Sequence, residues 1–393
     1  MGICCMNLEF SEASRIFREQ VRAWMSLNVP SEPLLSLDTS EGFNEHRKWE
    51  EKLASGNWSM VTWPKEYGGR GCSLVEWLIF EEEYYRAGAP LRVNQNGIFL
   101  LGPTLMEYGT ADQKARFLGA MSRGEEVWAQ AWSEPNAGSD MAAIRATARL
   151  EGDSYVINGQ KTWSTRAVYA DWAFSLLRTE EQSTRHNGLS FILIPLSEKG
   201  VTVRPIRQLN GLPGFAEIFF DNVRVPIENR IGAEGDGWGI AMSTAGFERG
   251  LLLRSPARFQ ETAAKLLSLY RLRVGDGADY SLEEKILDCY LQAEAYAIST
   301  YHTACKLDRG EKIGPEASCN KIFWTELDLR MHYIAMSLLG SEAEVLSDST
   351  AEASSSRRWI EDFVHAHSAP IYAGTNEIQR NIISERVLGM PRC

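Results

Sequence analysis

The sequence predicts a multidomain α+β protein with a helical domain over residues 1–125, a β-barrel-like domain over 126–235 and a four-helix-bundle-like domain over 236–393. The chain has 393 residues, which is more than one hydrophobic core usually organises. Apolar residues recur at helical spacing in its first and last parts. The middle part has short β-branched and aromatic runs separated by Gly, Asn and Asp, which is typical of strands and turns.

The first part is expected to be helical because Phe10, Phe17, Val21 and Trp24 recur at helical spacing. A turn-rich stretch over residues 63–71 interrupts the pattern, which resumes over residues 74–85. The charge run at residues 81–83 is predicted to be a solvated helix face.

In the middle part, residues 155–157 predict a strand, and Asn158-Gly159 directly after it predicts a hairpin turn. Further strands are expected at residues 191–195, 201–203, 217–220 and 223–226. This pattern predicts a small all-β domain, either a barrel or a sandwich.

In the last part, long amphipathic helices are expected over residues 282–307 and 321–339, and a helix over 376–388 closes the chain. Residues 354–356 fit either a loop or a helix start. We expect the two helical parts to pack together as one body.

Charge and cysteine usage exclude several classes of protein. With 41 basic and 52 acidic residues the net charge is −11, and no basic tract appears, so neither nucleic acid nor an anionic membrane surface is an expected partner. No apolar run approaches the roughly 20 residues that span a bilayer. The seven cysteines are scattered without a CxxC pair, which favours free thiols in a reducing cytoplasm over disulfides or zinc.

Three segments have the composition of a ligand site. Residues 130–140 form a loop of aromatic, hydroxyl and small residues, suited to a planar ligand or a phosphate, although an ordinary surface turn fits equally well. The second segment, residues 158–165, contains Trp163, which either lies against an aromatic cofactor or is a core tryptophan of the β domain. The third segment is residues 371–380, where Thr375 or Asn376 is expected to cap a helix.

Other chemistries have weak or no signals. His365 and His367 form the one close histidine pair, and no metal site is predicted from them. No GxSxG element frames a nucleophilic serine, and no GxGxxG follows a strand.

Taken together and in this order, the three segments resemble the acyl-CoA dehydrogenase family over nearly the whole chain. The loop at residues 133–140 matches the family pattern TEPxAGSD with Ser133 in place of Thr. Residues 163–165 match its Trp-x-Thr element, and residues 372–375 match its Tyr-(Glu or Gly)-Gly-Thr element.

The resemblance implies FAD between the β domain and the C-terminal helices. The implied ring contacts are Trp132, Ser133 near the reactive N5 edge, and Trp163 with Thr165 on the other side. The implied contacts further along the cofactor are Ser139 at the phosphates and Thr375 with Glu377 at the adenosine part and pyrophosphate. Ser139 and Arg249 are also expected to contact the substrate.

The reaction implied is the α,β-desaturation step of lipid β-oxidation, in which the protein removes a Cα proton from an acyl thioester and FAD accepts hydride from Cβ. The commonest family pattern has the basic Glu at the position of Ala373, which cannot accept a proton. A minority place it on a facing helix before an Arg, as in Glu248-Arg249, so we expect Glu248 to be the base. An exposed Glu248 paired with an arginine is the alternative. The Ala373 N–H is expected to stabilise the enolate oxygen.

A second departure concerns elements that reach a neighbouring subunit's FAD. Residues 270–277 lack the Phe-Gly of the family's Arg-x-x-Phe-Gly element, although Arg271 or Arg273 can still reach a phosphate. Residues 337–341 correspond to the family's Gln-x-x-Gly-Gly element and match it only in part. Similar changes occur in the branch that acts on bulky, often steroid-derived thioesters. The resemblance implies a homo- or hetero-oligomer that passes electrons to an electron-transfer flavoprotein.

Two other functions stay open from the sequence. One is a flavin oxidase or monooxygenase of the same fold, which would form peroxide. The other is a non-catalytic subunit of a heteromeric dehydrogenase, which would be colourless when purified.

Overall fold

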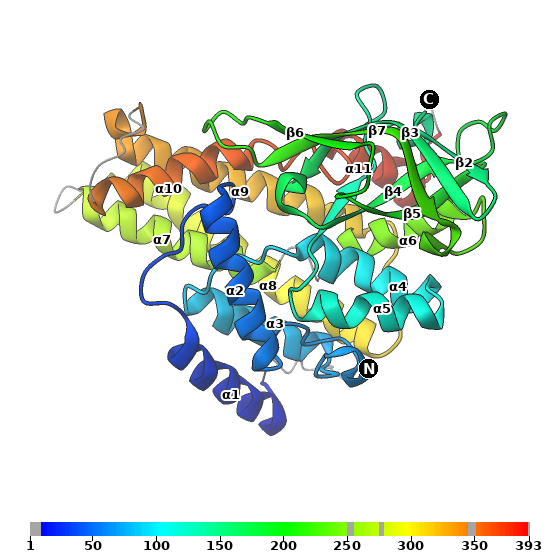
Figure 1. Cartoon of the computed structure of the whole chain (residues 1–393). Helices are drawn as coiled ribbons and strands as arrows, with labels where there is room; N and C mark the ends of the chain where they lie inside the picture. Colours follow the sequence, from blue (N-terminus) through cyan, green and yellow to red (C-terminus); the bar gives the residue numbers. More distant parts are fainter. Residues whose placement is uncertain (1–8, 250–254, 275–278, 345–350, 392–393) are drawn as a thin grey trace.

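The computed structural model describes residues 9–249, 255–274, 279–344 and 351–391; the side chains of residues 247–249 and 351–355 are outside this description. Figure 1 shows the predicted order of helices, then strands, then helices along the chain. The N-terminal helices lie below the green sheet in this view, and the C-terminal helices run alongside both parts. The predicted fold class is therefore confirmed.

Except for α4, the N-terminal helices begin at side chains that satisfy otherwise free backbone N–H groups. Ser11 and Thr39 accept from N–H groups of the first turns of α1 and α2, and Ser73 and Thr110 form reciprocal capping boxes at α3 and α5. The helices are α1 (Glu12–Asn28), α2 (Ser40–Ser55), α3 (Leu74–Arg86), α4 (Gly102–Tyr108) and α5 (Ala111–Ser122), with short turns η1 (Lys65–Tyr67) and η2 (Gly97–Leu101) between them.

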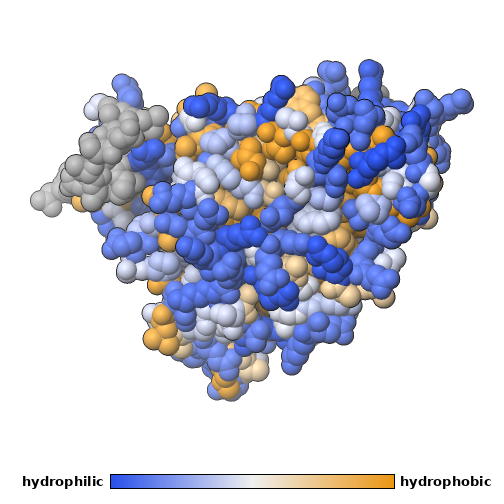
Figure 2. Space-filling model, viewed as in Figure 1, coloured by the Kyte–Doolittle hydropathy of each residue, from blue (hydrophilic) through white to orange (hydrophobic). Residues whose placement is uncertain are grey.

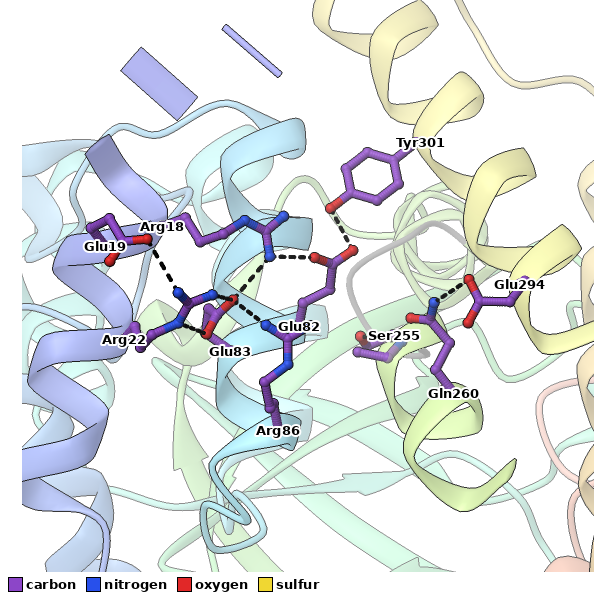
Figure 3. A network of polar contacts seen from close by, with 11 residues as sticks. Arg18, Glu19, Arg22, Glu82, Glu83, Arg86, Ser255, Gln260, Glu294 and Tyr301 are labelled. Atoms are coloured by element: carbon purple, nitrogen blue, oxygen red, sulfur yellow. Dashed lines mark hydrogen bonds and ion pairs between the residues drawn. The ribbon is translucent and has the colours of Figure 1, made fainter. Parts of the chain in front are cut away.

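The charge run at residues 81–83 is not a solvated face, so that prediction was wrong. Glu83 is only 2% exposed, and it accepts hydrogen bonds from Arg18 Nη1 and Arg22 Nε of α1, both at 2.9 Å. Glu82 accepts one from the Tyr301 hydroxyl at 2.7 Å, from a helix of the last part (Figure 3). These carboxylates therefore hold α3 against both neighbours.

The middle part forms an eight-stranded sheet within the described residues, in the order β6-β7-β3-β2-β4-β5-β8, with β1 paired to β4 in parallel. Its core contains Tyr155, Ile157, Ile192 and Ile218. The strands are β1 (Trp128–Ala131), β2 (Thr147–Glu151), β3 (Ser154–Thr165), β4 (Trp172–Arg178), β5 (Leu189–Pro195), β6 (Val201–Ile206), β7 (Phe215–Pro226) and β8 (Arg230–Ile231).

Asn158-Gly159 is not a hairpin turn. β3 continues through it while pairing with β7, and the pairing shifts register between Ile157 and Gly159. Gly159 has φ of 138°, so its conformational freedom is used for a bulge inside a long strand rather than for a turn. Likewise, residues 217–220 and 223–226 belong to the single strand β7.

The last part contains α6 (Gly237–Arg249), α7 (Pro256–Val274), α8 (Tyr280–Asp308), α9 (Ala317–Leu339), α10 (Ala351–Ala366) and α11 (Asn376–Ile382), with η6 (Gly340–Glu344) and η7 (Ile383–Val387). Residues 354–356 lie in α10, which decides for a helix there. α7, α8 and α9 share a core that includes Phe259, Ile286 and Trp324.

The two helical parts do pack together, because Ala304 of α8 lies in the same core as Trp77 and Leu78 of α3. α6 packs against β5 through Ile240 and Ala241. The face in Figure 2 is mostly hydrophilic, with its largest hydrophobic area near the strands. Among the residues that the structure describes, no helix is long and apolar enough to cross a membrane.

Candidate active site

The loop after β1 starts the candidate site. The Trp132 ring is buried, and it packs edge-on against Phe174 and Phe191 at 6.0 and 6.1 Å. Ser133 is half-buried, and its carbonyl accepts a hydrogen bond of 2.8 Å from the N–H of Thr162. The first predicted segment is therefore attached directly to the second.

Trp163 is not a core residue. It is 60% exposed and has φ of 60°, a conformation that non-glycine residues adopt rarely. The pairing of β3 with β7 shifts register between Lys161 and Ser164, which turns the indole out of the sheet, edge-on to Phe215. The core interpretation is thus wrong, and a planar ligand has an aromatic surface available. Thr165 follows as a half-buried residue opposite Phe215.

The third segment is a tight turn before α11. Ala373 has φ of 57° and Gly374 φ of 78°, and Gln379 Nε2 donates to both of their carbonyls, at 3.2 and 3.3 Å. Thr375 caps α11 by accepting from the Ile378 N–H at 3.2 Å. Among the described residues, the structure gives the Ala373 N–H no hydrogen-bond partner, so this donor is available to a ligand.

Asn376, the other candidate cap, is buried instead. Its side-chain oxygen accepts from Lys321 Nζ and from the Thr325 hydroxyl, both at 3.2 Å. Glu377 is exposed in the first turn of α11. Hydrogen bonds from its own backbone and from Thr375 lower the pKa of Glu377, so it is ionised at neutral pH.

The predicted base lies in the last turn of α6, but the side chains of Glu248 and Arg249 are outside the described residues. The beginning of this helix is tied to the loop after β1, because Ile240 and Ala241 share one hydrophobic core with Trp132. The Thr244 hydroxyl of α6 also contacts the Thr104 hydroxyl of α4 at 2.8 Å. α6 thus runs from the loop after β1 toward residue 248.

Two predicted residues lie at the edges of this arrangement. Ser139 is exposed, next to Asp140, which forms an ion pair with Arg185 at 2.9 Å. Arg273 Nη1 contacts Glu342 Oε1 at 2.6 Å, so the arginine expected at a phosphate is bound to a carboxylate of η6.

The structure gives a contact for one histidine of the close pair at residues 365 and 367. His367 Nε2 contacts the Tyr333 hydroxyl at 2.9 Å. In the described ranges, no group of three or more His, Cys, Asp or Glu side chains is arranged to hold a metal ion.

The sequence interpretation missed Lys161. This residue is fully buried, and its ammonium group contacts Glu134 Oε1 and the carbonyls of Trp132 and Leu176. Burial lowers the pKa of Lys161, while Glu134 opposes this effect. The available signal was a lysine inside the predicted β domain, and periodicity alone does not distinguish a buried lysine there from a solvent-facing one.

Three buried polar atoms of these segments have no hydrogen-bond partner in the described structure: Trp132 Nε1, Ser164 Oγ and Gln379 Oε1. Buried polar groups are nearly always hydrogen-bonded, so these atoms are available to a bound ligand. Both donors and acceptors are among them, one or more in each predicted segment. A large ligand with an aromatic ring and many polar groups, such as FAD, fits these residues.

Comparison with known proteins decides the family. Models of the N-terminal, middle and C-terminal domains of acyl-CoA dehydrogenases match residues 11–125, 129–223 and 235–388. This chain belongs to the acyl-CoA dehydrogenase family. It is an acyl-CoA dehydrogenase, an oxidoreductase that binds FAD, as the sequence motifs predicted.

Among its relatives is the acyl-CoA dehydrogenase IpdE1 of Mycobacterium tuberculosis, which is 39% identical over 96% of this chain and 97% of the relative. The ChsE4–ChsE5 complex of the same organism contains a chain of similar structure, with 29% identity, a TM-score of 0.84 and coverage of 99% and 100%. The Tcur3481–Tcur3483 steroid acyl-CoA dehydrogenase matches at 25% identity and a TM-score of 0.85, with the same coverage.

Proposed function

We propose that this chain desaturates a bulky acyl-CoA, with Glu248 removing the Cα proton. Bound FAD supplies the redox chemistry by accepting the hydride from Cβ. Two features together carry the proposal: the residue in the turn before α11 is Ala373, and α6 leads from the loop after β1 to Glu248. Ala373 has no basic side chain, and α6 starts in the hydrophobic core of Trp132 and ends at Glu248 and Arg249.

The backbone N–H of Ala373 is proposed to assist proton removal by stabilising the thioester oxygen. The α-proton of a thioester becomes acidic enough only when the developing negative charge on its oxygen is stabilised. The Ala373 N–H is unengaged among the described residues, and Gln379 Nε2 donates to the carbonyls of Ala373 and Gly374, which fixes the turn. A rigid backbone donor of this kind loses no freedom when the charge develops.

A bulky, ring-bearing acyl group is supported by the size of Ala373 and by one solved relative. The Tcur3481–Tcur3483 enzyme is named a steroid acyl-CoA dehydrogenase. An alanine in place of a glutamate leaves more room beside the reacting carbons.

A heteromer with a partner chain is supported by two relatives and by one ion pair. The ChsE4–ChsE5 and Tcur3481–Tcur3483 proteins each carry the names of two chains. Arg273 is bound to Glu342 rather than left open. We therefore propose that a partner supplies phosphate contacts.

We also propose an electron-transfer flavoprotein as the electron acceptor. A cytoplasmic location is proposed as well, and it is supported by the free thiols of Cys72, Cys289, Cys305 and Cys319.

The decisive experiment is anaerobic flavin reduction by straight, branched and ring-bearing acyl-CoAs. Glu248→Gln should slow reduction by about 10²- to 10⁴-fold with FAD still bound, because Gln keeps the size and removes the basicity. Glu261→Gln, which removes a carboxylate paired with Lys265 on α7, is the matched control. Wild-type rates in Glu248→Gln would refute the base. Peroxide formation would favour an oxidase, and a colourless purified chain would favour a non-catalytic subunit. A stable monomer with tightly held FAD would contradict the heteromer.

A further inference from the structure

We propose that Lys161 is a positioning residue for the cofactor: its ammonium group fixes the Trp132–Ser133 peptide against FAD. The proposal rests on the placement of this loop at the flavin ring in the proposed function. It assigns a role to a side chain that lies inside the sheet and that neither the desaturation step nor the cofactor contacts predicted from the sequence use.

Lys161 is completely enclosed, with 0% exposure. A lysine ammonium has three donors and no acceptor. Here each donor has one acceptor: Glu134 Oε1 at 2.8 Å, the Leu176 carbonyl at 2.8 Å and the Trp132 carbonyl at 3.2 Å. The Leu176 contact fixes the ammonium to β4, and the other two contacts extend from that fixed point into the loop.

Glu134 carries the constraint further along the loop. Its two carboxylate oxygens accept the N–H groups of Arg145 at 2.7 Å and Ala146 at 2.9 Å. Its backbone also exchanges two hydrogen bonds of 3.0 Å with Ala137. The loop after β1 is thus held at its start by Lys161 and closed on itself by Glu134.

The contacts of β3 leave one side of the Trp132–Ser133 peptide open to the cofactor. Lys161 and Thr162, which are consecutive in β3, bind the consecutive carbonyls of Trp132 and Ser133. With both carbonyls engaged from the strand, the Ser133 N–H and hydroxyl have no partner among the described residues. The Trp132 Nε1 is buried and unpartnered as well. β3 therefore holds one side of the peptide and leaves the donors of the other side to a ligand.

Stability alone does not account for this arrangement. A buried ion pair repays its desolvation poorly, and replacing both partners by uncharged residues of similar volume is often neutral. The contacts of Lys161 are instead directional, and two of the three end in the loop. We therefore expect the loss of Lys161 to act on FAD binding more strongly than on folding.

The test compares Lys161→Met and the double variant Lys161→Met, Glu134→Gln with the wild type. The double variant avoids leaving a buried, uncompensated carboxylate, so it keeps the test valid if Lys161→Met folds poorly. The thermal midpoint of the FAD-free chain reports folding, FAD titration reports affinity, and the visible absorption bands of bound FAD report its surroundings. Glu83→Gln removes another buried carboxylate, at α3, and is the control for a general loss of stability.

We expect the double variant to lose some thermal stability, because the amide that replaces the Glu134 carboxylate has one acceptor oxygen for two backbone N–H groups. Beyond that loss, it should bind FAD about tenfold more weakly and shift the absorption bands. Glu83→Gln should leave affinity and spectrum unchanged. A double variant with wild-type affinity and spectrum would overturn the proposal, as would losses that only follow the thermal midpoint. Trp163→Ala distinguishes a failure of this proposal from a failure of the proposed cofactor site. If Trp163→Ala weakens FAD binding and the Lys161 variants do not, only the role of Lys161 is wrong. If neither weakens it, the proposed cofactor site is wrong.

Discussion

The carbonyl of Ser133 accepts a 2.8 Å hydrogen bond from the N–H of Thr162, which joins the loop after β1 to the strand that presents Trp163. Two segments identified separately by sequence motifs are thus one structural unit. The register shift directly after Lys161 turns the Trp163 indole outward while the Thr162 N–H stays on the loop. Contact with the cofactor and the rigidity of the loop consequently depend on the same short stretch of β3.

Trp163→Ala should weaken FAD retention about tenfold and leave folding nearly unchanged. Trp163 is 60% exposed, so its loss removes little buried surface, and alanine inherits the same backbone conformation. Trp163→Phe keeps an aromatic surface and should retain more FAD than the alanine variant. FAD content after gel filtration measures the effect. Leu209→Ala, which removes an 87% exposed hydrophobic side chain, is the control, and equal FAD loss in both would contradict a specific role.

The ion pair between Arg273 and Glu342 gives a second prediction. If Arg273 contacts a phosphate in the assembled protein, Glu342 competes with that phosphate. Arg273→Ala should then lower the FAD content of the assembled protein, whereas Glu342→Gln should keep or raise it. Surface ion pairs contribute only about 0–1 kcal/mol, so neither change should unfold the chain. The FAD-to-protein ratio at low and high salt is the measurement, and identical ratios in both variants would remove Arg273 from the cofactor site.

Glu81 and Glu83 of α3 are expected to change the stability of the fold with pH in opposite directions. Burial raises the pKa of Glu81 to about 7, with Arg92 and Ser255 opposing it. Because the folded protein holds this proton more tightly, Glu81 favours the fold most at low pH, and this contribution is lost between about pH 4.5 and 7. Burial also acts on Glu83, but hydrogen bonds from Arg22 and Arg18 (Figure 3) outweigh it and lower its pKa, so the contribution of Glu83 is lost as the pH falls below about 4.5.

Thermal midpoints between pH 4 and 8 test these signs. Glu81→Gln should be stabilised relative to the wild type as the pH rises to 8, by up to about 1.4 kcal/mol for each pH unit between the two pKa values. Glu83→Gln should be destabilised by a nearly constant amount from pH 8 to about 4.5, and the difference from the wild type should begin to shrink only below that pH. The result that counts against the assignment is a parallel pH profile for the two variants.

The fold class was predictable because the change from helical to strand patterning is a local property of the sequence. The features that failed are non-local. The carboxylate of Glu83 is buried because Arg18 and Arg22 approach from α1, and no spacing within α3 indicates this. Trp163 is exposed because of a bulge that depends on the pairing of β3 with β7.

The candidate site shows the same division. The motifs identified the segments around Ser133 and Thr375, since a family resemblance preserves residue types along the chain. The supporting residue Lys161 stayed undetected, because its role depends on a carbonyl of β4 and a loop carboxylate that only the folded sheet brings together. The roles of Glu248 and Arg249 remain predictions.

The most demanding prediction moves the base between helices. In a Glu248→Gln background, Ala373→Glu should recover flavin reduction by a straight-chain acyl-CoA at least about tenfold over the single variant. The backbone N–H at position 373 is unchanged by the substitution, so the proposed stabilisation of the enolate oxygen persists while a carboxylate returns to the commonest family position. The new side chain also fills the space left by alanine, so ring-bearing substrates should recover less than straight ones. Anaerobic rapid mixing measures both rates. With FAD fully bound, no recovery for any substrate would show that position 373 does not face the reacting carbons, and equal recovery for all of them would remove Ala373 as the source of room for bulky groups.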